Sequence, residues 1–120
     1  MNVRIHEVQG KRIAEMLSDG IVIRTSRDGL GIVGEMLSRG LKGLILYEKN
    51  VAPEFLQLQT GIAGEVLQKL ATYDMRVGFV GNFEDHKSKS LQAFITESNQ
   101  GNQVCFTKSL ESALEKLGSA

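Results

Sequence analysis

Cysteine, proline and an excess of either charge are the features that this sequence has least of. Its 120 residues include one cysteine, Cys105, and one proline, Pro53, while Lys plus Arg and Asp plus Glu are 14 each. A single cysteine cannot form an internal disulfide, which predicts a reducing compartment. Zero net charge gives no general attraction to nucleic acid or to an anionic membrane, so we expect neither as a partner.

Long apolar runs are also missing. No uninterrupted run approaches the length that crosses a bilayer, and residues 1–10 lack the apolar centre of a signal peptide. The sequence therefore predicts a soluble, cytoplasmic protein. Its length and its 42% of hydrophobic residues predict one globular domain, residues 1–120, with a single core.

Sequence signatures of several chemistries are absent. The chain has no G-x-S-x-G sequence of the serine-hydrolase type, and His6, His86 and Cys105 do not have the spacing of zinc ligands. We therefore expect no metal site and no cofactor. Because no catalytic set is assembled in the sequence, we favour a non-enzymatic function.

Hydrophobic periodicity predicts a single-domain mixed α/β fold. The expected strands are residues 3–8, 11–17, 44–47, 77–80 and 104–106. The expected helices are one capped by Ser26 or Asp28 and ended by Gly40, a short one from Pro53, residues 60–72, one capped by Ser88 or Ser90 and ended near Gly101, and one capped by Ser109. The order β-β-α-β-α-β-α-β-α predicts an N-terminal hairpin followed by a mainly parallel sheet. Residues 21–23 form either a short strand or a buried connection.

The stretch 44–70 is expected to hold the working face. It runs from a covered strand through a polar loop into an amphipathic helix, and open α/β sheets place ligands or partners at such strand ends. The helix that follows has an apolar side toward the core. The interaction residues that we expect in this stretch are Lys49, Asn50, Glu54, Phe55, Thr60 and Gly61.

The order of elements resembles the STAS domain of anti-sigma-factor antagonists and sulphate-transporter tails. The signature of that family reads strand, Asp-Ser-Ser/Thr-Gly-Leu-Gly, helix, and residues 58–63 (LQTGIA) stand in the corresponding place. Thr60, Gly61 and Ile62 match by residue type. Residues 75–83 and the closing segment 109–114 also correspond by position. The chain is similar, too, to a family of small bacterial proteins of unknown function.

The STAS resemblance implies a regulatory module that binds another protein and carries a phosphorylation switch at Thr60. A phosphate at a helix start lies beside free N–H groups and the positive end of the helix dipole. The added charge would expel an acidic or apolar partner from the docking face. The simpler alternative is that Thr60 only caps the helix. A protein partner is therefore expected, and the sequence leaves the oligomeric state open.

Two other functions remain alternatives. Gly29, Gly31 and Gly34 spell G-x-G-x-x-G, and Glu48 follows Gly29 by 19 positions, which is close to the spacing of a dinucleotide-binding fold. That pattern predicts a turn that binds a small ligand or a nucleotide. The second alternative is a small enzyme in which Glu48 acts as a general base near Thr60.

Overall fold

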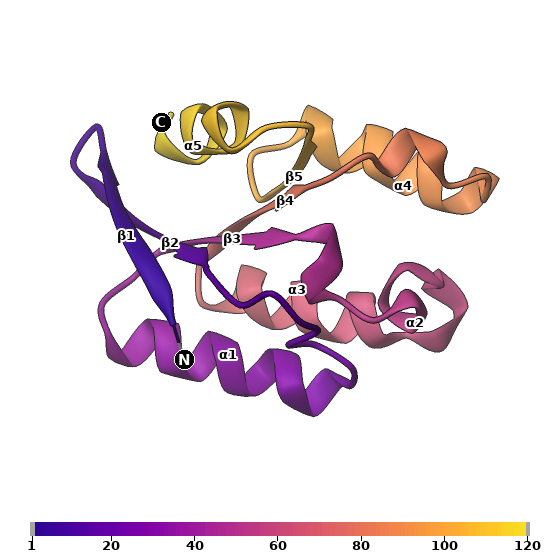
Figure 1. Ribbon diagram of the computed structural model, residues 1–120, viewed down its shortest axis with the longest axis horizontal. Helices are drawn as coiled ribbons and strands as arrows, with labels where there is room; N and C mark the ends of the chain where they lie inside the picture. The colour runs from indigo at the N-terminus through magenta and orange to yellow at the C-terminus, as the bar shows by residue number, and fades with distance from the viewer. Residues whose placement is uncertain (1, 120) are drawn as a thin grey trace.

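The computed structural model describes residues 2–119, and Figure 1 shows how they are arranged. The strands are β1 (Val3–Val8), β2 (Lys11–Met16), β3 (Gly43–Tyr47), β4 (Arg76–Val80) and β5 (Val104–Thr107). The helices are α1 (Ser26–Ser38), α2 (Pro53–Leu56), α3 (Ile62–Thr72), α4 (Lys89–Gln100) and α5 (Leu110–Gly118). The predicted α/β fold, a hairpin followed by alternating helices and strands, is confirmed. Within residues 2–119, no helix is long and apolar enough to span a membrane.

The five strands form one sheet in the order in which they occur along the chain. β1 and β2 are antiparallel and are joined by the tight turn at Gln9 and Gly10, which both have positive φ. β2, β3, β4 and β5 are parallel. Each crossover steps to the next strand in the same direction, so right-handed connections place α1, α3 and α4 on the same face. In Figure 1, α5 returns across the opposite face.

Each face of the sheet has its own apolar core. The larger core joins side chains of α1, α3 and α4, among them Met36, Val66 and Ile95. The smaller core lies under α5, where Ala113 and Leu117 pack with Ile45 of β3. Because side chains alternate along each strand, β3 contributes Leu44 to the first core and its neighbour Ile45 to the second.

Side-chain caps fix where the longer helices begin. Thr25 Oγ1 accepts a hydrogen bond from the N–H of Asp28, and Asp28 Oδ2 accepts one from the N–H of Thr25, both at 3.2 Å. This capping box makes Thr25, and not Ser26, the cap of α1, with Asp28 as its third residue. Ser88 and Ser109 cap α4 and α5, as predicted.

Residues 21–23 form a connection and not a strand, which is the second of the two alternatives that the sequence left open. Ile23 is buried and makes an isolated parallel bridge with Val51. Of the three glycines in α1, Gly29 alone faces inward: a Cβ there would lie 2.5 Å from Cγ2 of Val66 in α3, whereas Gly31 and Gly34 are exposed. The buried residues of α1 are therefore Gly29, Ile32, Val33 and Met36.

Candidate functional site

Three loops meet at the carboxyl end of β3. They are residues 17–25 after β2, residues 48–61 after β3 and residues 81–88 after β4. Parallel strands end at one edge of the sheet, so these loops leave it together. In Figure 1 this edge is on the right, where α2 lies and where α1 and α4 begin. We call it the carboxyl edge.

Glu48 joins the loop after β3 to the loop after β4. Its Oε1 accepts a hydrogen bond from the N–H of Asn82 at 3.1 Å, and its Oε2 lies 2.6 Å from Nε2 of His86. The two side chains of the Glu48–His86 pair are 33% and 34% exposed, so solvent reaches both. A Cβ on Gly81 would lie 2.5 Å from Glu48 Oε1, so only glycine leaves room for this arrangement.

Gln92 and Phe83 fix the position of His86. Gln92 of α4 donates through Nε2 to the carbonyl oxygens of Phe83 at 2.7 Å and of His86 at 2.8 Å. The imidazole ring also stacks against the ring of Phe83, with 6.2 Å between centroids. His86 is therefore fixed both through its ring and through its main chain.

Asn50 joins the loop after β3 to the loop after β2. Its Oδ1 accepts from the N–H of Tyr47 at 2.9 Å, and its Nδ2 donates to the carbonyls of Ser18 and Gly20, each at 2.9 Å. The side chain is completely buried. Asn50 was therefore wrongly predicted to be an exposed interaction residue. Its hydrogen bonds instead join the two loops beneath that surface.

A buried carboxylate lies on the α5 face beside the same strand end. Glu15 of β2 is 5% exposed; its Oε2 accepts from the Tyr47 hydroxyl at 2.7 Å, and its Oε1 lies 2.8 Å from Nε2 of His6. Burial raises the pKa of Glu15, but the hydrogen bonds from Tyr47 and His6 and the positive charges of His6 and Arg4 outweigh it, so the net pKa is lowered. Burial and the bond to Glu15 raise the pKa of Tyr47 to about 12.

The other expected interaction residues differ in exposure. Lys49, Glu54 and Thr60 are exposed, and Gly61 is half-buried with φ of +80°, where it caps α3. Phe55 is 1% exposed and packs against Phe79 of β4, with 5.6 Å between ring centroids. Phe55 was therefore wrongly placed on the surface, because the short α2 turns it into the core.

The Thr60 hydroxyl bonds within its own loop. Thr60 Oγ1 lies 2.9 Å from the carbonyl oxygens of Glu54 and Gln57, to which it can donate, and it accepts from the N–H of Ile62 at 3.3 Å. The two oxygens of Glu48 bond instead to Asn82 and His86. The structure thus joins Glu48 to His86 and not to the threonine with which the sequence grouped it.

The three glycines of the G-x-G-x-x-G pattern lie inside α1. Gly29 faces α3, whereas Gly31 and Gly34 are exposed and have open space where a Cβ would be. The turn expected for a phosphate-binding loop is a continuous helix at these positions. We therefore assign Gly29 to helix packing.

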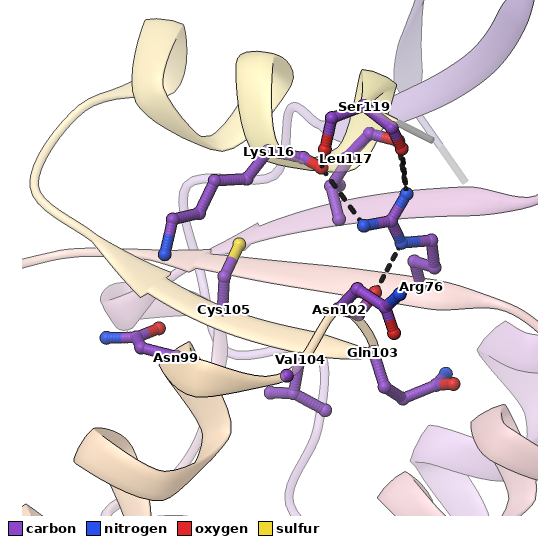
Figure 2. Close-up of a pocket in the computed structure, with 10 residues that line it drawn as sticks. Arg76, Asn99, Asn102, Gln103, Val104, Cys105, Lys116, Leu117 and Ser119 are labelled. Atoms are coloured by element: carbon purple, nitrogen blue, oxygen red, sulfur yellow. Dashed lines mark hydrogen bonds between the residues drawn. The ribbon is translucent and has the colours of Figure 1, made fainter.

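A small cavity lies at the opposite, amino-terminal edge of β4 and β5 (Figure 2). It has a volume of about 150 Å³, and its walls include Cys105, Lys116 and Arg76. The Arg76 guanidinium donates to the carbonyls of Leu117 at 3.1 Å and of Ser119 at 2.6 Å, so it caps the end of α5. Burial raises the pKa of the Cys105 thiol, which keeps it protonated and poorly nucleophilic.

No pattern in the sequence predicts the Glu48–His86 pair or the buried Glu15. Partners such as Glu48 and His86 are separated by 38 positions, and only the meeting of parallel strand ends predicts that their loops are close. Across residues 2–119, no group of three or more His, Cys, Asp and Glu side chains is arranged to hold a metal ion.

Comparison with known proteins gives one informative match. The family model described as "Domain of unknown function (DUF4180)" matches residues 8–117, whereas no curated protein and no solved structure matches significantly. The expected resemblance to a family of unknown function is confirmed to that extent, while the resemblance to the STAS domain is not confirmed. Because the match covers nearly the whole chain, the protein belongs to the DUF4180 family, a domain of unknown function.

Proposed function

We propose that this protein is a regulatory module that binds another protein through the carboxyl edge. The observation that carries the proposal is the bridge from Glu48 to Asn82 and His86, which holds two loops as one surface. Because hydrogen bonds already join those loops, binding a partner costs little free energy for fixing them.

The charges of this surface define the kind of partner. Lys49 and Lys108 supply positive charge, and Glu54 and Asp85 supply negative charge, all on exposed side chains. A surface of mixed sign suits a protein partner with complementary charges better than a uniformly charged polymer such as nucleic acid.

Thr60 remains the proposed phosphorylation position on this surface. Its hydroxyl lies against two carbonyl oxygens, those of Glu54 and Gln57. A phosphate there could not donate to either oxygen and would repel both, so it would open the segment between α2 and α3. Phosphorylation would thus change the shape of the surface as well as its charge.

Site-specific photocrosslinking in cells of the source organism tests the docking face. A benzophenone amino acid replaces exposed Gln59 at the carboxyl edge or, as the matched control, exposed Gln100 at the end of α4. We expect discrete adducts from position 59 and none of the same mass from position 100. Thr60→Glu should remove the adducts, whereas Thr60→Ala should keep them.

Equal adducts from both positions would contradict a docking face at the carboxyl edge. Identical adducts from the wild type, Thr60→Glu and Thr60→Ala would remove the threonine switch and leave the docking face in place.

A further inference from the structure

We propose that the Nδ1 atom of His86 is a phosphoryl acceptor and that Glu48 holds the ring in the reactive tautomer. The inference rests on the proposed docking face, because it names a covalent regulation of that same surface. It is carried by the geometry of the Glu48–His86 pair.

The hydrogen bond to Glu48 decides which ring nitrogen carries the proton. A carboxylate can only accept, so at 2.6 Å the Nε2 atom of His86 must be the donor. In the neutral ring the lone pair is then on Nδ1. Within residues 2–119, Nδ1 has no hydrogen-bond partner, and the side chain is 34% exposed. A nucleophilic nitrogen with a fixed orientation therefore lies on a side chain that solvent reaches.

The surroundings suit an added phosphoryl group. Lys87 and Lys89 follow His86 in the sequence; both are exposed, and neither makes an ion pair in the part of the chain that the structure describes. Glu84, two positions before His86, pairs with Lys108 at 3.0 Å. Asp85 remains as a like charge and would be the group that moves away.

His6, the other histidine of the chain, is the internal comparison. Its Nε2 also pairs with a carboxylate, Glu15, but its side chain is only 22% exposed and lies in the middle of β1. The two histidines therefore share the pairing and differ in access. We expect His86 to react first.

The reaction transfers phosphorus from one nitrogen to another. The donor class is a phosphoramidate, of which phosphohistidine on another protein is one example. The Nδ1 lone pair attacks phosphorus and forms the new P–N bond, while the P–N bond of the donor breaks and its nitrogen leaves with the bonding pair. With phosphoramidate itself, already protonated on nitrogen, ammonia leaves and no further proton is needed. The proton on Nε2 stays between the ring and Glu48, whose charge balances the cationic ring.

Phosphorylation would add negative charge at the centre of the carboxyl edge. A phosphoryl group brings about −1.5 to −2 charges beside Glu48 and Asp85. The modified surface would repel an acidic partner segment that the unmodified protein binds. His86 would then control docking without opening the fold.

Labelling with potassium phosphoramidate tests the acceptor. Phosphorylation is followed by ³¹P NMR and by mass spectrometry of peptides kept at alkaline pH, in the wild type, Glu48→Gln, His86→Gln and Glu15→Gln. We expect His86 to be labelled before His6. Glu48→Gln should slow the labelling of His86 by about tenfold or more, because the amide donates to Nε2 and forces the proton onto Nδ1. Glu15→Gln should leave the rate at His86 unchanged.

Long-range ¹H–¹⁵N spectra of the histidine rings separate a tautomer effect from a loss of structure. The wild type should show the proton on Nε2 of His86, and Glu48→Gln should show it on Nδ1 with the amide spectrum otherwise retained. A rate at His86 no higher than at His6, or an unchanged rate in Glu48→Gln, would overturn the assignment.

Crosslinking of phosphorylated protein that carries the benzophenone amino acid at position 59 tests whether phosphorylation of His86 controls docking. We expect the adducts to disappear after labelling of the wild type and to persist in treated His86→Gln. Labelled protein that still forms its adducts would overturn the regulation and leave the docking face standing. Adducts missing from every sample would overturn the docking face, while labelling would still establish the acceptor.

Discussion

The Tyr47 hydroxyl donates to the Glu15 carboxylate at 2.7 Å, and through this bond the end of β3 is joined to a buried acid on β2. The carboxylate also lies 2.8 Å from Nε2 of His6, so three neighbouring strands share one hydrogen-bonded cluster. Removing any member leaves a buried polar group without its partner. The cluster therefore fixes the β1 hairpin against the strand that leads into the candidate site.

Tyr47 should ionise late in the native protein. Burial and the bond to Glu15 raise its pKa from 10.0 to about 12. The cluster then favours folding fully below pH 10 and loses that contribution as pH rises toward 12. Absorbance at the tyrosinate band should show a transition in this range that Tyr47→Phe removes; a transition near pH 10 assigned to Tyr47 would contradict the bond.

Glu15 should stabilise the protein most at neutral pH. Because its folded pKa is lowered from 4.5, the stabilisation is present above the unfolded value and is lost as pH falls through the folded one. Glu15→Gln should lower the free energy of unfolding by about 1–3 kcal/mol at pH 7, with a smaller difference below pH 4. Urea denaturation at both pH values measures this. Exposed Glu7→Gln on β1 is the control and should change stability by less than about 0.5 kcal/mol.

Asn50 should matter for stability although it follows a charged, exposed loop residue. Asn50→Ala removes the hydrogen bonds to the N–H of Tyr47 and to the carbonyls of Ser18 and Gly20, which should cost about 2 kcal/mol or more. Lys49→Ala, one position earlier, removes a surface ion pair with Asp19 and a contact of the ammonium with the Tyr47 ring, and it should cost less than about 1 kcal/mol. Equal losses in the two variants, measured by chemical denaturation, would show that the Asn50 bonds contribute nothing.

The sequence could predict the fold because its signals are local. Apolar runs such as residues 44–47 and caps such as Ser88 and Ser109 define strands and helix starts within a few residues. The rule that crossovers are right-handed then determines how these elements are arranged. The parallel strands also predicted which edge of the sheet carries the candidate site. The sequence could not predict which side chains pair at that edge, because the contact of Glu48 with His86 depends on the path of the loop after β4 and on the space left by Gly81. Phe55 was misplaced because four residues of helix have no readable periodicity.

The contact of Gly29 with Val66 should set how closely α1 and α3 pack. A Cβ on Gly29 would lie 2.5 Å from Cγ2 and 3.0 Å from Cγ1 of Val66, and the buried side chain of Val66 has little room to move. Gly29→Ala should therefore destabilise the protein despite the better helix propensity of alanine. Gly31→Ala and Gly34→Ala meet open space and should instead stabilise it by up to about 1 kcal/mol each.

The double variant Gly29→Ala with Val66→Ala tests the cause. Removing the two Cγ atoms clears the clash, so the double variant should be more stable than the sum of the two single changes predicts. Thermal unfolding of the four proteins measures this coupling. Additive losses would mean that Gly29 is not needed for the helix contact, and its place in the G-x-G-x-x-G pattern would then need another explanation.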